Sequence, residues 1–211
     1  MISQQPEWKM IWGEIYSRRQ NAFIMFNLNF FTICWWLFII IWTISAFSVK
    51  PSKERQDWGG RLFTFAFLTV TFLLLAGKVS WWGMNERICP YNQSMLLLAY
   101  ALTLAGLATL TWARWSLGRN WSAIVTFREQ HELVQHGPYR FVRHPIYTGI
   151  LLMVAGTATV LGNFAGLLSL VICFLGHWWK LRREEALLTK HFPETYPDYM
   201  SRTKALIPFI F

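Results

Sequence analysis

The sequence predicts an all-α integral membrane protein with five transmembrane helices, the last two forming a tight helical hairpin. The chain of 211 residues is 54% hydrophobic and only 15% charged, whereas a typical soluble domain has about 25% charged residues. Long apolar runs recur along it, and the longest has a turn-forming pair at its middle. Its 17 Phe and 13 Trp residues also exclude a disordered chain.

Three apolar runs are each long enough to cross a hydrocarbon core, which needs about 20 residues. They cover residues 22–49, 62–82 and 94–113. The second contains Lys78 four residues from its end, where the aliphatic stem can reach the interface. Tryptophans that gather at membrane interfaces lie near the ends of these runs: Trp81, Trp82, Trp112 and Trp115.

A fourth run, residues 146–179, contains no charged residue. As one helix it would be about 51 Å long at 1.5 Å per residue, far longer than a core of about 30 Å. Gly162 and Asn163 lie at its middle and readily form a turn. We therefore expect two short antiparallel helices, the second continuing beyond Trp179 into residues 180–191.

Five crossings distribute the basic residues unequally. Fifteen Lys and Arg fall on one side and four on the other, and the positive-inside rule makes the crowded side cytoplasmic. The N-terminus is then outside, while the loop 114–144 and the tail 180–211 share the cytoplasmic face. The net charge of +9 thus follows from topology, and we expect a lipid bilayer rather than a nucleic acid as partner.

We expect one integrated membrane domain, with a three-helix scaffold over residues 1–113 and a functional region over residues 114–211. Cys34, Cys89 and Cys173 are too few and too scattered to indicate a disulfide framework or a metal site. The N-terminus lacks the pattern of a cleavable signal peptide.

Motifs of soluble nucleotide-binding enzymes and hydrolases are absent from the sequence. His131 and His136 at first suggest a zinc-binding helix, but they are five residues apart. That spacing is about 140° around a helix, so the two rings cannot share one face. We therefore expect no metal.

The loop before the hairpin contains several candidate functional residues. Pro145 suits the first turn of a helix and directs His144 out of helical geometry, near the N-cap. A helix N-terminus has unpaired N–H groups that suit an anionic part of a ligand. A purely structural interpretation also stays open, with Gly137-Pro138 as a turn, Arg143 on lipid phosphate, and Tyr139 and Tyr147 as interfacial aromatics.

The tail begins with a charged stretch that continues the last helix. Lys180 and Glu184 are four residues apart, and Arg182 and Glu185 are three apart, so each pair shares a helical face. These pairs can simply stabilise a solvated helix, but adjacent acids are notable in a chain with 11 acidic residues. Aromatic residues and prolines follow that can fold the chain end back over the site: Phe192, Pro193, Tyr196, Tyr199 and Pro208.

Loop and tail together resemble the isoprenylcysteine carboxyl methyltransferase family and its relatives among membrane phospholipid methyltransferases. In the loop the resemblance rests on Leu133-Val134, Gly137-Pro138-Tyr139, Arg143-His144-Pro145, Tyr147 and Gly149. In the tail it rests on Glu184-Glu185, Leu188, Phe192, Tyr196, Tyr199 and Pro208. Residues 117–122 also resemble the segment that precedes this motif in bacterial members.

The resemblance implies a membrane methyltransferase that uses S-adenosylmethionine (SAM), bound in a cytoplasmic pocket between loop and tail. Carried over by position, the cofactor-binding residues are His131, Glu132, Leu133, Val134, Tyr139, His144, Pro145, Ile146, Tyr147 and Glu184. The candidates for acting on the methyl acceptor are Lys180, Arg182, Arg183, Arg143 and Glu185.

One position departs from the pattern. The carboxyl methyltransferases have an arginine four residues before the cofactor-binding glutamate, where this chain has Lys180, a point charge instead of a planar fork. An acceptor carboxylate needs only a cation to orient it, whereas an amine must lose a proton, for which His144 or a glutamate is a candidate base. Both acceptors stay open, and we expect either to be lipophilic.

Two other functions also stay open. Sterol reductases that use NADPH resemble the C-terminal half distantly, although they usually have more membrane helices. A non-catalytic lipid-binding membrane protein would use loop and tail only as interfacial anchors. The oligomeric state is not predicted.

Overall fold

The computed structural model describes residues 29–45, 58–78, 83–89, 91–118 and 133–208. Within these residues every named element is a helix, so the predicted all-helical fold is confirmed for this part of the chain. The elements are α2 (Trp58–Leu75), α3 (Gln93–Leu117), the 3-10 helix η2 (Gly137–Arg140), α4 (Pro145–Leu161), α5 (Phe164–His191) and α6 (Thr195–Arg202). A further apolar helix, Asn29–Ser45, precedes them.

Three helices are long and apolar enough to cross a membrane, namely α2, α3 and α5. The helix Asn29–Ser45 and α4 are apolar but shorter. Large apolar side chains such as Phe65 and Leu97 are exposed on the described helices, as a hydrocarbon environment favours. These features support an integral membrane protein, while the number of five crossings stays a prediction.

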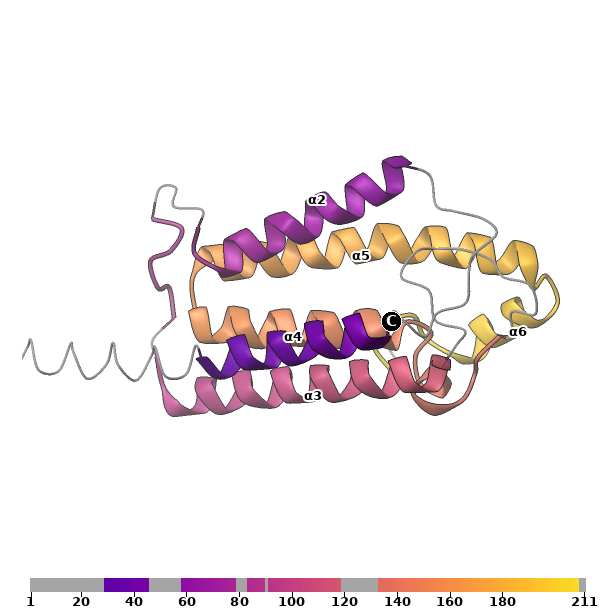
Figure 1. Cartoon of the computed structure of the whole chain (residues 1–211), viewed down its shortest axis with the longest axis horizontal. Helices are drawn as coiled ribbons and strands as arrows, with labels where there is room; N and C mark the ends of the chain where they lie inside the picture. Colours follow the sequence, from indigo (N-terminus) through magenta and orange to yellow (C-terminus); the bar gives the residue numbers. More distant parts are fainter. Residues whose placement is uncertain (1–28, 46–57, 79–82, 90, 119–132, 209–211) are drawn as a thin grey trace, which may run out of the picture.

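Helices α4 and α5 run antiparallel and are joined by two residues (Figure 1). Helix α4 ends because Gly162 adopts the left-handed conformation, with φ 57° and ψ 32°. The side chain of Asn163 then caps α5 by accepting a hydrogen bond from the Gly166 amide at 2.8 Å. The apolar run 146–179 therefore breaks at the predicted pair.

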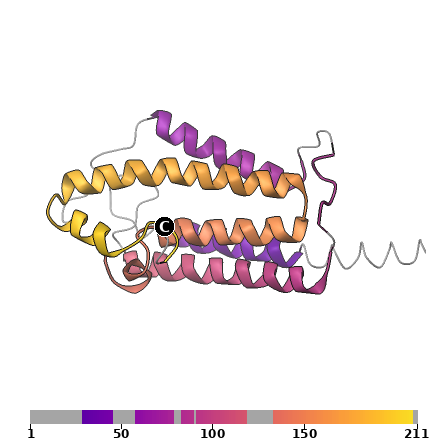
Figure 2. The ribbon, with the colours of Figure 1, turned by 180° about the vertical axis from the view of Figure 1, so that it is seen from behind.

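Helix α3 lies along α4, and α2 lies along α5 (Figures 1 and 2). The α3–α4 contact is close because glycines meet there. A Cβ atom on Gly106 would lie 2.6 Å from the carbonyl oxygen of Gly149, and one on Gly149 would lie 2.7 Å from that of Gly106. The backbones thus touch directly, and Leu110 and Met153 are fully buried beside them.

Helix α3 extends past the predicted end of its apolar run at residue 113. Arg114 lies in its last turn, where the side chain is buried and donates hydrogen bonds to the carbonyl oxygens of Ser45 and Gly118, both at 2.7 Å. These bonds explain why a charged residue is tolerated within the helix. The predicted loop therefore begins after α3, and the division of the chain at residue 113 stays a prediction.

The end of the bundle opposite the α4–α5 turn brings several segments together. The start of α4, the last turns of α5, η2 and α6 all lie at this end (Figures 1 and 2). It is the end that carries the candidate functional residues.

Candidate functional site

The loop before α4 is held by local structure. Gly137 has a φ of 62° and begins η2, in which Pro138 and Tyr139 are buried. His144 is the N-cap residue of α4 and Pro145 is its first helical residue, as the sequence predicts. The imidazole of His144 is therefore fixed at the start of the helix, and it is 6% exposed.

The segment that includes α6 and the residues after it, 195–206, runs back over this loop, and we call it the C-terminal strap. The amides of Arg143 and His144 donate to the carbonyl oxygens of Lys204 and Ala205, at 2.8 and 3.0 Å. The Tyr199 hydroxyl donates to the carbonyl oxygen of Tyr139 at 2.5 Å. The chain end thus folds back over the site, as its aromatic residues and prolines suggest.

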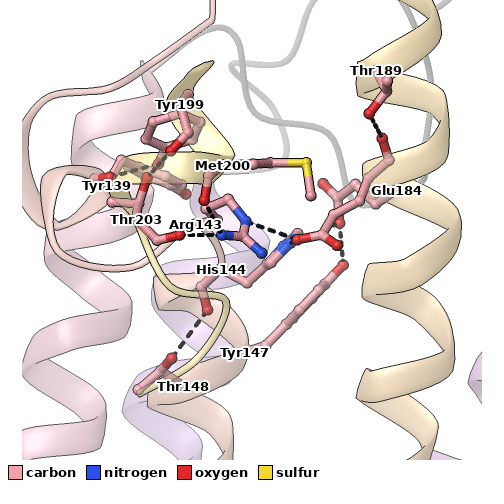
Figure 3. A network of polar contacts seen from close by, with 11 residues as sticks. Tyr139, Arg143, His144, Tyr147, Thr148, Glu184, Thr189, Tyr199, Met200 and Thr203 are labelled. Atoms are coloured by element: carbon pink, nitrogen blue, oxygen red, sulfur yellow. Dashed lines mark hydrogen bonds and ion pairs between the residues drawn. The ribbon is translucent and has the colours of Figure 1, made fainter. Parts of the chain in front are cut away.

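A polar network joins the loop to α5 (Figure 3). Tyr147 Oη donates to Glu184 Oε2 at 2.7 Å, and Arg143 Nε donates to Glu185 Oε1 at 2.8 Å. The His144 ring lies between the two carboxylates, with Nε2 3.3 Å from Glu185 Oε1 and Nδ1 3.8 Å from Glu184 Oε2. It also stacks on the Tyr147 ring, with centroids 5.3 Å apart and planes inclined by 5°. Residues predicted from two distant stretches therefore meet.

The three basic residues of α5 that the sequence analysis selects have different surroundings. Lys180 Nζ lies 5.5 Å from the centroid of the Tyr147 ring and one turn before Glu184. Arg182 and Arg183 are exposed and lie over the rings of Trp178 and Trp179, at 5.7 and 4.6 Å. Of the three cations, Lys180 is the one beside the network.

The remaining predicted residues are placed as follows. Leu133 and Val134 are partly buried, and Pro145 is buried at the start of α4. Ile146 packs on the apolar cluster that contains Tyr147 and Leu181. His131 and Glu132 lie outside the described residues. Cofactor contact by any of these side chains stays a prediction.

Sequence reasoning missed His177, which is buried beside the network. Its ring lies 5.0 Å from that of Tyr147 and 5.2 Å from that of Phe67 on α2. Its Nδ1 lies 2.8 Å from the carbonyl oxygen of Cys173. The spacing of residues 177, 180 and 184 along one helical face was the available signal.

Burial raises the pKa of two tyrosines of the site, one in the loop and one in the tail. It raises the pKa of Tyr139 well above its usual value, and the negative charge of Glu184 adds to the rise. It raises the pKa of Tyr199 to about 12, although Arg143 opposes the shift. The hydroxyl of Tyr196 is buried and has no hydrogen-bond partner among the described residues. All three hydroxyls are donors at neutral pH, and that of Tyr196 has no acceptor within the part of the chain that the structure describes.

The chain is similar to membrane methyltransferases and to a metal-resistance protein. The phospholipid methyltransferase family model matches residues 94–195. Identity to the protein-S-isoprenylcysteine O-methyltransferase of Saccharomyces cerevisiae is 32% over 150 residues, 68% of this chain and 59% of that protein. Identity to the cobalt-zinc-cadmium resistance protein CzcN of Cupriavidus metallidurans is 33% over 146 residues, 67% of this chain and 61% of that protein.

A solved structure of a eukaryotic intramembrane Ras methyltransferase, isoprenylcysteine carboxyl methyltransferase, has a similar fold. The TM-score is 0.51 at 21% identity, over 75% of this chain and 55% of that one. The chain thus spans about three fifths of the length of the two curated relatives. The resemblance predicted from the loop and tail motifs is confirmed, because residues 94–195 match the phospholipid methyltransferase family model and the Saccharomyces relative is an isoprenylcysteine O-methyltransferase by name.

Proposed function

We propose that the protein is a membrane-embedded methyltransferase that uses SAM and methylates a lipophilic acceptor. The observation that carries the proposal is the meeting of Tyr147 with Glu184 at 2.7 Å, which joins the loop and the tail of the family motif in one site. In the proposed topology five helices cross the bilayer, the N-terminus is outside, and this site faces the cytoplasm.

The residues of the site fit a cationic cofactor. When bound, SAM supplies a methyl group carried on positively charged sulfur. The Glu184 side chain is 32% exposed, so its carboxylate is open to a ligand while the Tyr147 hydroxyl fixes its orientation. We assign it to the positive charge of the cofactor. The buried Tyr196 hydroxyl offers a further donor in the same region.

Lys180 is the proposed orienting group for the acceptor. Its ammonium lies over the Tyr147 ring, one helical turn before Glu184. The Saccharomyces relative is named for methyl transfer to the oxygen of an isoprenylcysteine. We extend this to an acceptor carboxylate here, because a carboxylate is already a nucleophile and needs a cation to align it but no base. The apolar helices around the site would admit its lipid part and exclude water.

The two alternative functions are not favoured. A family match over residues 94–195 and a fold shared with a methyltransferase support neither an NADPH-dependent sterol reductase nor a non-catalytic lipid-binding protein. Ligand-dependent thermal stabilisation separates the three. We expect stabilisation by S-adenosylhomocysteine (SAH), whereas the reductase predicts it for NADP and the lipid-binding protein for neither.

Activity is tested with the purified full chain and SAM labelled in the methyl group. Three acceptors are compared: a small S-prenylated cysteine, phosphatidylethanolamine, and the same cysteine without its prenyl chain. We expect label in the prenylated cysteine, released as methanol by alkali because the product is an ester. Base-stable label in phosphatidylethanolamine would show N-methylation and refute the carboxylate assignment. Label in neither lipophilic acceptor would refute the proposed function.

A further inference from the structure

Two nitrogen atoms of the Arg143 guanidinium make contacts within the chain. Its Nε donates to Glu185 Oε1 at 2.8 Å, and its Nη1 donates to the backbone carbonyl oxygens of Met200, at 3.3 Å, and Thr203. The side chain is 11% exposed. One residue thus connects the loop before α4 with α5 and with the C-terminal strap (Figure 3).

The carboxylate of Glu185 is the counterpart of this contact. It is 8% exposed, and its Oε1 receives Arg143 Nε and lies 3.3 Å from His144 Nε2. Successive residues on a helix point about 100° apart. Glu184, the adjacent residue, accordingly bonds to Tyr147 and remains partly exposed. The two glutamates therefore have different environments and different partners.

The contacts form a continuous path from the strap to the proposed cofactor site. Strap carbonyls bind Arg143, Arg143 binds Glu185, and Glu185 lies against His144. His144 stacks on Tyr147, whose hydroxyl binds Glu184. An acceptor carboxylate that took the Nε atom of Arg143 would have to separate a buried ion pair, which leaves an uncompensated charge.

We propose that Arg143 and Glu185 are positioning residues, which latch the C-terminal strap onto the loop and thereby hold His144 and Tyr147 against Glu184. They contact neither the methyl acceptor nor the methyl group. Only the identity of the ligand held by Glu184 rests on the proposed function, since the latch itself consists of contacts within the chain.

The latch is tested first without ligand, by hydrogen exchange of the full chain in detergent. The amides of Arg143 and His144 donate to strap carbonyls, so their exchange reports docking of the strap. We expect Arg143→Lys, which loses the planar fork, and Glu185→Gln, which loses the charge, each to speed exchange of these amides about tenfold or more. Unchanged exchange in both variants would overturn the latch.

A matched control comes from the same strap. Asp198 and Arg202 form an exposed ion pair on α6 at 2.7 Å, with side chains 65% and 62% exposed. We expect Asp198→Asn to leave the exchange of the Arg143 and His144 amides within twofold of the wild type, because exposed pairs contribute little. An effect as large as that of Glu185→Gln would mean that any charge change on the strap releases it, and would contradict the latch.

The coupling of the latch to the proposed cofactor site is tested by calorimetric binding of SAH and by steady-state kinetics. We expect Glu185→Gln and Arg143→Lys to weaken SAH binding about tenfold, and to leave the acceptor KM within twofold at saturating SAM. A raised acceptor KM with unchanged exchange would assign Arg143 to the acceptor and overturn the proposal. A wild-type chain that binds no SAH would refute the proposed function, and the exchange data would still decide the latch.

A second variant covers the case in which a buried charge change prevents folding. Thr148 Oγ1 donates to the strap carbonyl of Leu206 at 2.7 Å, so Thr148→Val loosens the strap without altering the ion pair. We expect faster exchange of the His144 amide and weaker SAH binding. Faster exchange with unchanged SAH affinity would break the proposed connection between strap and site.

Discussion

Replacing Glu184 with glutamine isolates the charge of the carboxylate from its geometry. The amide oxygen can still accept the hydrogen bond that Tyr147 Oη now donates to Glu184 Oε2. The fold is therefore expected to persist, and any loss of cofactor affinity measures the lost charge.

The expected loss of cofactor affinity follows from the distance between the two charges and from the solvent around Glu184. Two unit charges about 4 Å apart attract by about 1 kcal/mol in water and by about 4 kcal/mol at an effective dielectric constant of about 20. Because the Glu184 side chain is 32% exposed, solvent screens the pair and the lower part of this range applies. We expect a loss of about 1–2 kcal/mol, which is about 5- to 30-fold in Kd.

The assay is calorimetric binding of SAM and of SAH to the purified chain in detergent. SAH lacks the charge on sulfur, so a larger loss for SAM than for SAH would assign Glu184 to the sulfonium, and equal losses would assign it to the ammonium. Glu194→Gln, which changes an exposed carboxylate two residues beyond Phe192, is the control. A Kd for both ligands within twofold of the wild type would refute the assignment of Glu184.

Three further outcomes are expected. Lys180→Met raises the acceptor KM about tenfold at saturating SAM. Lys190→Met, at an exposed position of the same helix, leaves this KM unchanged. Equal effects of the two substitutions would exclude Lys180 as the orienting group. Gly149→Ala separates α3 from α4, because its Cβ would lie 2.7 Å from a backbone oxygen, and costs about 1–3 kcal/mol. Thermal unfolding in detergent checks this, with Ala105→Leu on the exposed face of α3 as the neutral control. Burial raises the pKa of Tyr199 from 10.0 to about 12, so its contribution to stability is complete below pH 10 and is lost as the pH rises through about 12. Tyr199→Phe should remove this loss of stability and, with it, the rise in tyrosinate absorbance that accompanies ionisation of Tyr199. If that rise in absorbance were already complete near pH 10, the assigned burial of Tyr199 would be contradicted.

Local chemistry made part of the fold predictable. Gly162 and Asn163 mark the break between α4 and α5 because the first tolerates a positive φ and the second caps a helix. Pro145 likewise places His144 at an N-cap. Each of these signals acts within a few residues, so the sequence contains it directly.

Contacts between distant residues were not predictable in the same way. The motif nominated Arg143 and Glu185 without showing that they bind each other across 42 positions. Nothing local to Arg114 indicates that α3 continues through it, because its stabilising bond to Ser45 comes from another helix. The helical spacing of His177 from Lys180 and Glu184 was its one sequence signal, and that spacing does not show that its ring lies against Tyr147 on another helix.

The brevity of α4 has a consequence for the surrounding lipid. Its 17 residues span about 26 Å, several ångströms less than a hydrocarbon core of about 30 Å. In the proposed topology we expect the bilayer to thin locally and meet both ends of the helix, which is one accommodation of a short apolar helix. His144, at its start, then lies level with the outermost acyl carbons, so a lipid-anchored acceptor reaches the site with little vertical displacement. Hydrophobic mismatch thereby ties the reaction to membrane thickness, and turnover should fall in vesicles of longer-chain lipids.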